Sequence, residues 1–236
     1  MLEIKHVTKK YGEKIAVQDI TLTVEDGTIF GFIGHNGAGK TTLIKAIVGI
    51  HEFDSGDILI NGISIKTSEI EYKRQLAYIP DNPDLYENLT GIDYLNFIAD
   101  IYEVDSKIRE DRIKKYATTF ELLPHLGDLI SSYSHGMKQK LAIISSLIHD
   151  PRVLVLDEPF VGLDPKSSKD LKDIMKSLCK DGTTIFFSSH VLEVVEKLCN
   201  RVGIIKNGKL IKEGTTKEIT SSEDLESVFL ELTDEE

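Results

Sequence analysis

The amino-acid sequence predicts an α/β fold in which a phosphate-binding core carries an antiparallel β subdomain and an inserted helical subdomain. Three observations predict it. A strand-like apolar run at residues 28–33 leads through a glycine-rich loop into an amphipathic helix. A second apolar run, at residues 153–156, has the length of a buried parallel strand. Residues 83–149 show only helical spacing, and 236 residues suffice for one core with an appendage.

The beginning of the chain is typical of strands that give way to a helix. Residues 2–8 and 16–25 alternate apolar and polar side chains, and a turn signal then precedes the run at 28–33. From Gly39 onward apolar residues recur at helical spacing, and Gly49 ends the pattern. A strand, a glycine loop and a helix in this order form the first half of a parallel α/β unit.

The middle of the chain, about residues 83–149, is predicted to form the helical subdomain. Strand signals are absent from this stretch of sequence, and Thr90 stands three residues before Asp93, the spacing of a capping box at a helix start. Helical spacing is clearest in the first predicted helix, with Ile92, Leu95, Ala99 and Tyr102.

The second half of the chain returns to alternating strands and helices. Two short apolar runs, at residues 153–156 and 183–187, are typical of buried parallel strands. Residues 167–180 and 191–199 show helical spacing and are expected to be crossover helices. These elements complete the parallel core.

The C-terminal region is predicted to contain a hairpin and a docked helix. Residues 201–211 read as strands around Asn207 and Gly208, a hairpin turn signal. We therefore expect the main domain to cover residues 1–220 and a short helical tail to cover 221–236. The tail is acidic, with an apolar face that consists of Leu225, Val228, Phe229 and Leu232.

Charge and composition exclude several classes of function. The chain has 28 Lys and Arg against 39 Asp and Glu, a formal net charge of -11. Nucleic acid and anionic lipid would repel such a surface, so we expect no nucleic-acid partner. The longest apolar runs are far shorter than the roughly 20 residues that cross a bilayer. The N-terminal residues do not resemble a targeting signal, so we expect a cytoplasmic protein.

Residues 34–41 read GHNGAGKT and satisfy the phosphate-loop pattern G-x-x-x-x-G-K-[ST]. Small residues let successive backbone amides point at phosphate oxygens, and the helix that follows adds the positive end of its dipole. Lys40 supplies a full charge, and Thr41 supplies a hydroxyl for magnesium. The strand before and the helix after disfavour an ordinary glycine-rich turn. The residues expected to bind nucleotide phosphates are Gly34, Asn36, Gly37, Ala38, Gly39, Lys40, Thr41 and Thr42.

Residues 153–158 read VLVLDE, an apolar strand that ends in two carboxylates. Alone, this segment could be a strand followed by an acidic helix cap. Phosphoryl transfer, however, uses one carboxylate in the metal shell and another group to orient the attacking water. Beside a phosphate loop, we therefore predict that Asp157 is a metal residue and that Glu158 is catalytic.

Further segments carry a specific resemblance. Residues 133–140 read YSHGMKQK and resemble the signature motif of ATP-binding cassettes, usually written LSGGQ. Residues 160–165 resemble that family's D-loop, and residues 188–190 resemble its switch-histidine segment. Residues 78–81 lie where the family has its Q-loop. Because the segments follow one another in the family's order, the chain is identified as a member of the ATP-binding-cassette (ABC) ATPases.

The resemblance implies roles for residues outside the two first motifs. Tyr11 would stack on adenine, and His190 would contact the γ-phosphate as a catalytic residue. Ser134, Gly136 and Asp164 would bind ATP held by a second copy of the chain. Structural alternatives remain open: Tyr11 could pack at a sheet edge, His190 could be a buried histidine that caps the next helix, and Ser134 could be only an N-cap.

The sequence departs from the usual family pattern at three positions. His135 and Met137 stand where the signature usually has Gly and Gln, and Asp81 stands where the Q-loop usually has Gln. These departures resemble a branch of bacterial exporter ATPases that includes the bacitracin-resistance, sodium-efflux and Ecs types, with the Ecs type most similar. Asp81 is a candidate metal residue, either as a direct Mg²⁺ ligand or from outside the first shell.

The resemblance therefore implies an enzyme that binds ATP and Mg²⁺ and hydrolyses ATP to drive export. Its partners would be a second nucleotide-binding subunit, arranged head-to-tail, and an integral membrane permease. The protein would be peripheral at the inner face of the membrane. We expect the permease to contact residues 81–86, with Leu85 and Tyr86 as apolar anchors. An importer ATPase, a soluble ABC ATPase outside transport and a non-hydrolysing module are the alternatives.

Overall fold

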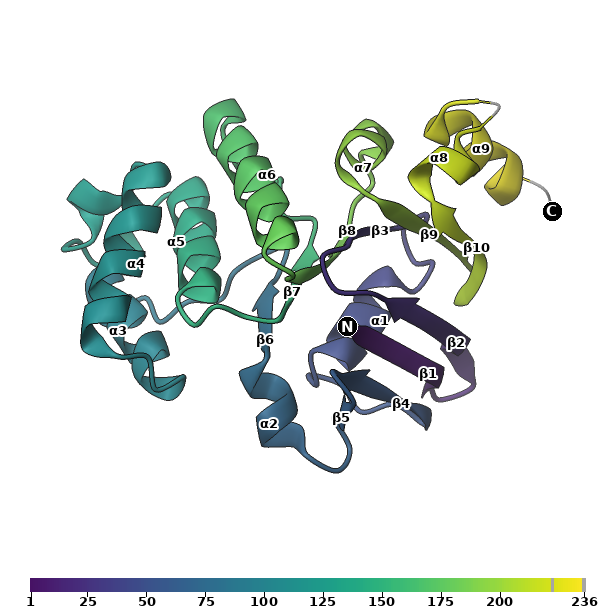
Figure 1. Ribbon diagram of the computed structural model, residues 1–236, viewed down its shortest axis with the longest axis horizontal. Coiled ribbons are helices and arrows are strands. Elements are labelled where there is room, and N and C mark those ends of the chain that lie inside the picture. Colours follow the sequence, from purple (N-terminus) through teal and green to yellow (C-terminus); the bar gives the residue numbers. More distant parts are fainter. Residues whose placement is uncertain (222, 235–236) are drawn as a thin grey trace.

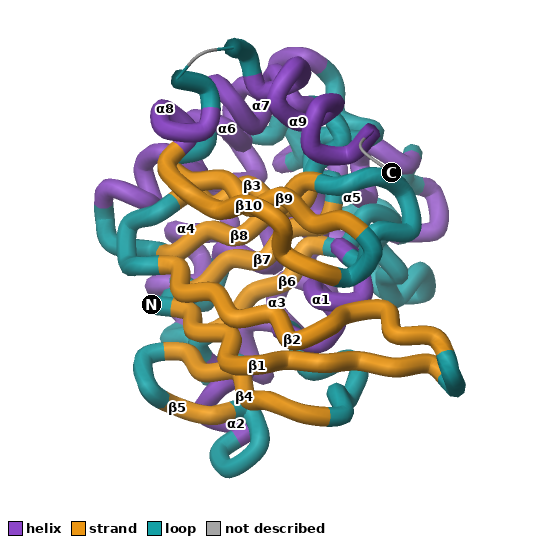
Figure 2. The backbone as a smooth tube through the Cα atoms, turned by 90° about the vertical axis from the view of Figure 1, so that its right-hand side faces the viewer, coloured by secondary structure: helices purple, strands orange, loops and turns teal. Residues whose placement is uncertain are grey.

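The computed structural model describes residues 1–221 and 223–234 and contains two β-sheets (Figures 1 and 2). The smaller sheet consists of β1 (Leu2–Tyr11), β2 (Lys14–Val24), β4 (Ser55–Ile60) and β5 (Ile63–Ser64). Its strands pair antiparallel in the order β2-β1-β4-β5. This sheet is the predicted antiparallel β subdomain, and β1 and β2 confirm the strands expected from alternation.

The larger sheet holds the predicted parallel core. It consists of β3 (Ile29–Ile33), β6 (Leu76–Ile79), β7 (Val153–Asp157), β8 (Thr184–Ser188), β9 (Arg201–Lys206) and β10 (Lys209–Thr215). The order is β10-β9-β3-β8-β7-β6, and only the edge strand β10 pairs antiparallel in the part of the sheet that the structure describes. The carboxyl ends of β3, β7 and β8 therefore meet at one edge, where ligands bind in open α/β sheets.

Most of the helices pack on the side of the larger sheet that lies away from the smaller sheet (Figure 1). Three of them, α3 (Gly91–Ile101), α4 (Ser106–Thr119) and α5 (His135–Leu147), lie within the region expected to be helical. Short 3₁₀ turns at Leu123–His125 and Ile130–Ser132 connect α4 to α5. The remaining helices are α1 (Lys40–Ile47), α2 (Glu69–Arg74), α6 (Pro165–Lys180), α7 (Leu192–Leu198), α8 (Thr216–Ile219) and α9 (Leu225–Asp234).

The start of α3 shows how local chemistry sets an element boundary. Thr90 is the N-cap, and its hydroxyl oxygen accepts a hydrogen bond from the Asp93 amide at 3.2 Å. The Asp93 carboxylate then accepts from the Thr90 hydroxyl at 2.5 Å. The expected cap is present, but the returning carboxylate contacts the capping side chain, whereas a capping box uses the backbone amide.

Two hydrophobic cores lie on either side of the larger sheet. On β8, Phe186 faces the core shared with α1 and the smaller sheet, whereas Phe187 faces the core shared with α3, α5 and α9. Successive strand residues point to opposite faces, so a strand buried on both faces must be apolar throughout. This explains why β7 and β8 could be recognised from short apolar runs.

The tail folds back onto the core. In α9, Leu225, Val228 and Phe229 are buried, and Leu232 packs against the same cluster. Residues 222, 235 and 236, which belong to the predicted tail, lie outside the described residues. Within residues 1–221 and 223–234, none of the helices combines the length and the apolar character that crossing a membrane requires.

Candidate nucleotide site

The phosphate loop connects β3 to α1 and depends on glycines with positive φ. Gly37 has a φ of 81° and Gly39, the N-cap of α1, has a φ of 113°. A Cβ on Gly39 would lie 2.5 Å from the carbonyl oxygen of Ala16. Only glycine therefore combines this backbone conformation with the close approach of β2. The space beside Gly37 is open, which leaves room for an anion at the loop.

Lys40 is held by the loop itself. Its Nζ donates to the carbonyl oxygens of Gly34 at 2.6 Å and His35 at 3.2 Å, and the residue is 8 % exposed. Burial lowers the pKa of Lys40, whereas the nearby carboxylates of Glu158 and Asp157 act in the opposite direction. The ammonium group thus lies close to the backbone of the loop and close to two anions.

The two predicted carboxylates lie at the end of β7 and are fixed by β8. Asp157 is paired with Ser188 in the strand register, is 4 % exposed, and accepts the Ser188 hydroxyl at 2.5 Å. The Glu158 amide donates to the same hydroxyl oxygen at 3.2 Å. Glu158 has a φ of 48°, an uncommon conformation for this residue type. Ser188, which is fully buried, therefore orients both acidic residues.

His190 contacts Glu158 directly. The His190 Nδ1 lies 2.9 Å from Glu158 Oε2, and the His190 backbone amide donates to the same oxygen at 3.3 Å. The histidine side chain is 61 % exposed, so the alternative of a buried histidine is wrong. Val191, not His190, is the N-cap of α7. The pair presents one carboxylate and one imidazole beside the phosphate loop.

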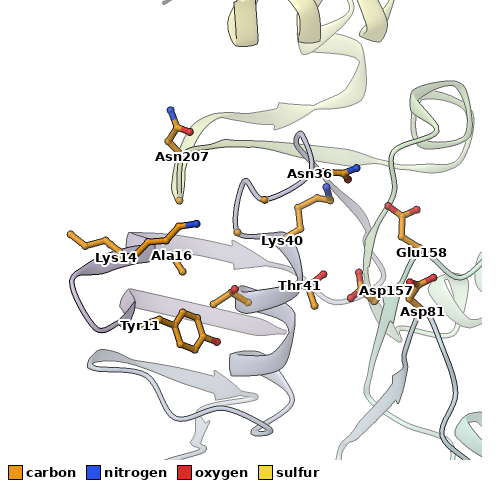
Figure 3. A pocket seen from close by; sticks show the side chains of 15 residues that line it. Tyr11, Lys14, Ala16, Asn36, Lys40, Thr41, Asp81, Asp157, Glu158 and Asn207 are labelled. Atoms are coloured by element: carbon orange, nitrogen blue, oxygen red, sulfur yellow. The ribbon is translucent and has the colours of Figure 1, made fainter.

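A cavity of about 620 Å³ brings the phosphate loop, the carboxylates and Tyr11 together (Figure 3). Lys40 and Thr41 lie between Tyr11 on one side and Asp157, Glu158 and Asp81 on the other. Tyr11 is 47 % exposed, which leaves its ring available to a flat ligand. The residues that line the cavity are Tyr11, Lys14, Ile15, Ala16, Asn36, Gly37, Gly39, Lys40, Thr41, Thr42, Asp81, Asp157, Glu158, Asn207 and Gly208.

Two hairpin turns line the cavity without having been predicted as site residues. Asn207 and Gly208, with φ of 50° and 78°, form the turn between β9 and β10. The Gly208 amide donates to the Ala38 carbonyl at 2.8 Å, and its own carbonyl accepts from Gln18 at 2.8 Å. Sequence showed the turn, but nothing in its spacing indicated that it braces the phosphate loop. Lys14, at the other turn, had no recognisable signal.

The oxygen atoms of the cavity suit magnesium. Thr41 offers a hydroxyl, and Asp157 and Asp81 offer carboxylates that both help to raise the pKa of Tyr78, after burial as the largest cause. In the described part of the chain no group of three or more His, Cys, Asp and Glu side chains could hold a metal. Magnesium is usually held by one or two protein carboxylates together with substrate phosphates and water, and Asp157 with Thr41 fits that pattern.

The signature segment lies apart from this cavity. Ser134 is the N-cap of α5, and its hydroxyl oxygen accepts from the Met137 amide at 3.3 Å. A Cβ on Gly136 would lie 3.0 Å from the Gly162 carbonyl oxygen, so the signature and the D-loop segment are adjacent. Neither Ser134 nor Gly136 lines the cavity, and their binding of ATP stays a prediction.

Asp164 has a full set of partners within its own chain. It is the N-cap of α6, accepting from the Ser167 amide at 2.9 Å, and it forms an ion pair with Lys140 at 2.8 Å. The hydrogen bond from Lys140, followed by those from Ser167, holds the pKa of Asp164 well below its usual range. Its contact with ATP also stays a prediction.

One of the two predicted apolar anchors is not at the surface. Leu85 is 8 % exposed and belongs to the core that α3 and α5 share, so the prediction that it contacts a permease directly is wrong. An apolar residue in a polar loop can pack into the core or dock against a partner, and Leu85 packs into the core. Tyr86 is 57 % exposed, and its ring packs edge-on against Phe97 of α3.

Comparisons with known proteins agree with this geometry. Residues 17–161 match the family model described as ABC transporter. The chain is 32 % identical to the ABC-type transporter ATP-binding protein EcsA of Bacillus subtilis, over 100 % of this chain and 98 % of that protein. It is 37 % identical to the bacitracin transport ATP-binding protein BcrA of Bacillus licheniformis, over 90 % and 69 %.

A solved structure supports the same assignment. The structure described as that of an ATP-binding subunit of an ABC transporter superimposes with a TM-score of 0.95 and 34 % sequence identity. The superposition covers 98 % of this chain and 99 % of the other. The fold is therefore shared over nearly the full length of both chains.

Proposed function

The chain belongs to the ABC transporter family as an ATP-binding subunit with ATPase activity, and we propose that it powers export through a separate membrane permease. The observation that carries the enzymatic part is the cavity in which the phosphate loop faces Asp157 and Glu158, with His190 in contact with the Glu158 carboxylate. Export is supported by the resemblance of His135, Met137 and Asp81 to the exporter branch. The relative BcrA is also named as a bacitracin transport protein.

The residues of the cavity divide the work of hydrolysis in this proposal. The loop amides and Lys40 bind the phosphates of ATP, and the Lys40 ammonium exchanges its loop carbonyl partners for phosphate oxygens. Thr41 and Asp157 would hold Mg²⁺, which would supply positive charge to neutralise the phosphates. Glu158 orients the attacking water and takes its proton, while His190 holds the Glu158 carboxylate in place through their 2.9 Å contact.

Two copies of the chain complete the site in a head-to-tail dimer. The first turn of α5 presents Ser134 and free backbone amides at the surface, and this is a favourable position for a phosphate. Val161, within the D-loop segment, is 42 % exposed, and Val191, which follows His190, is 43 % exposed. A second copy would cover these apolar side chains. Closing around ATP and reopening after hydrolysis would drive the permease.

The permease surface in this proposal consists of Tyr86, Phe97 and Ile101. These three residues are 57 %, 41 % and 53 % exposed, and Phe97 and Ile101 lie one turn apart on α3. Tyr86 packs against Phe97 with ring centroids 5.6 Å apart. Aromatic residues with this exposure are typical anchors at protein interfaces. Contact there would place the protein at the inner face of the membrane.

Co-expression with a candidate membrane permease tests the proposal. We expect the complex to be recovered with the wild type, and the double variant Tyr86→Ser with Phe97→Ser to lose the membrane protein while keeping the ATPase activity of the isolated subunit. Leu123→Ser, at a 43 % exposed apolar residue elsewhere, is the control. Unchanged recovery of the double variant would contradict this surface.

Direction is tested in inverted membrane vesicles that contain the complex. ATP is then outside, so an exporter accumulates a compound in the lumen, and an importer does not. Bacitracin is a suitable first probe because a relative is named for its transport. Strict dependence of the ATPase on DNA or ribosomes, with no membrane partner, would instead support the soluble alternative.

A further inference from the structure

The C-terminal helix α9 lies against the core close to the nucleotide site. The Leu225 amide, at its first residue, donates to the Glu196 carboxylate of α7 at 3.0 Å, and the two helices pack together. In turn α7 begins directly after His190 and packs on β3, where a Cβ on Gly31 would lie 2.6 Å from Val195. Figure 1 shows α7 and α9 on the same side of the larger sheet.

Phe229 of α9 contacts the phosphate loop. Its ring centroid lies 4.8 Å from that of His35, with the ring planes inclined by 56°. This distance is within the range of favourable aromatic pairs. Phe229 is only 7 % exposed, although it stands close to the end of the chain, whereas the His35 side chain is exposed apart from this contact. The tail therefore covers one side of the exposed segment of the loop, residues 35–37.

His35 is the residue through which this contact reaches Lys40. The His35 carbonyl accepts from Lys40 Nζ at 3.2 Å and from the Ala38 amide at 3.1 Å, so it closes the loop on itself. Fixing the His35 side chain restricts the backbone conformations of the loop, and a loop that is already ordered loses less entropy when it binds a phosphate.

A second cavity joins the same residues to the histidine segment. It has a volume of about 180 Å³ and is lined by Gly34, His35, Asn36, Ser189, His190, Leu192 and Phe229. Phe229 is the one lining residue that comes from neither the phosphate loop nor the segment at 189–192. The aromatic ring thus closes the space between the loop that binds phosphate and the histidine that contacts Glu158.

We propose that Phe229 is a positioning residue for ATP binding: through His35 it holds the phosphate loop in its binding conformation. The helix α9 is then part of the nucleotide site and not a passive tail. The inference rests on the nucleotide site described above, and it adds a residue far from every motif of the sequence. It concerns binding of the phosphates, which the loop contacts both before and during the reaction.

Steady-state ATPase kinetics of three variants test this role. Phe229→Ala and His35→Ala should each raise the KM for ATP about 2- to 10-fold, the range expected for one aromatic contact, and leave kcat within about twofold. Val228→Ala is the matched control, because Val228 is 5 % exposed on the same helix but lines neither cavity. It should lower the Tm as Phe229→Ala does, with an unchanged KM.

The double variant decides whether the effect passes through His35. If it does, Phe229→Ala should add no further rise in KM on the His35→Ala background. Multiplying effects, or equal KM changes for Phe229→Ala and Val228→Ala, would overturn the proposal. His35→Ala removes the same ring pair at an exposed position and keeps the test valid if Phe229→Ala does not fold. A wild type that fails to bind ATP would refute the nucleotide site itself, which is a separate outcome.

Discussion

The cavity around the phosphate loop and the cluster around the signature segment differ in how complete they are. In the cavity, the Lys40 cation and three carboxylates face one space of about 620 Å³, and the His190 imidazole contacts one of these carboxylates. In the signature cluster, Ser134 and His135 lie at the surface, and the neighbouring Asp164 is already paired with Lys140. One region has the groups that a reaction needs, and the other offers free helix amides that a ligand from elsewhere must reach.

This difference shows how a surface can be half of a site. His135 packs on the D-loop segment, since a Cβ on Gly162 would lie 2.5 Å from its ring, and Lys140 holds Asp164 at 2.8 Å. The signature helix α5 therefore contacts the D-loop at two points. In the proposed head-to-tail dimer, this cluster would gain a binding function when a second copy supplies the phosphates.

The largest effect is expected in the cavity, from Glu158→Gln. The amide keeps the shape of the side chain but cannot accept the proton of the attacking water, so turnover should fall about 100-fold or more. ATP binding should persist, and closed dimers should accumulate in size-exclusion chromatography with ATP and Mg²⁺. Glu193→Gln, at an exposed residue paired with Lys197, is the control and should hydrolyse ATP normally. Near wild-type turnover of Glu158→Gln would refute its catalytic role.

Mixing two inactive variants tests whether the two regions form one composite site. Lys40→Ala removes the phosphate-loop cation, and Ser134→Arg blocks the signature helix. A mixed head-to-tail dimer keeps one site with both halves intact, so equal mixing should restore about a quarter of wild-type activity, because about half the dimers are mixed. Mixing Lys40→Ala with Glu158→Gln should restore nothing, since both changes affect the same half. Failure of the first mixture to exceed its components would contradict the composite site.

Much of the cavity was predictable because its chemistry is local. The loop at residues 34–41 and the strand end at Asp157 and Glu158 are each a short continuous segment. Each segment matches a pattern that phosphate chemistry requires. The braces were not predictable. Gly208 reaches Ala38, and Phe229 reaches His35, across many residues of chain, and no periodicity records such a contact. Leu85 shows the same limit, because burial depends on what packs around a side chain.

The fold, too, was predictable where the sequence pattern is local and strong, and not elsewhere. The long alternating strands and the buried strands β7 and β8 have strong patterns, whereas β4, β5, β6 and α2 were not located. The last three have only 2, 4 and 6 residues, too few for periodicity to separate strand from helix. The order of strands in the larger sheet is a long-range property, set by which helices cross over, and no segment carries it alone.

A smaller effect is expected for Asp81→Asn, which tests the metal side of the cavity. Asp81 lines the cavity with Asp157 and Glu158, and a third carboxylate near the phosphates adds repulsion, so we expect Asp81 to act from outside the first metal shell. Turnover should fall by about twofold at most, with a nearly unchanged Mg²⁺ requirement. Titration of the ATPase with Mg²⁺ at saturating ATP measures this. A severalfold rise in the half-maximal Mg²⁺ concentration would make Asp81 a direct ligand.

The smallest effect concerns stability in the signature cluster, through Lys140→Met. The Lys140 ammonium is the main cause of the low pKa of Asp164, and a carboxyl with a depressed folded-state pKa stabilises the fold above its unfolded pKa near 4. That contribution is lost as the pH falls through the lower folded-state pKa.

Because Asp164 is about half exposed, water screens the pair, and Lys140→Met should lower the Tm by about 1–2 °C at pH 7. At pH 4 the Asp164 carboxyl is still ionised in the folded wild type, so the difference from wild type should shrink only at lower pH, as Asp164 takes up a proton in both folded proteins. Thermal unfolding followed by circular dichroism, from pH 7 into the acid range, measures this difference in Tm. The control for loss of a charge is Lys138→Met, also on α5, which removes the ion pair with Glu87. A Tm difference for Lys140→Met that stays constant to the lowest pH at which both proteins still fold would show that Lys140 stabilises α5 by packing alone and does not tie the signature helix to the D-loop by charge.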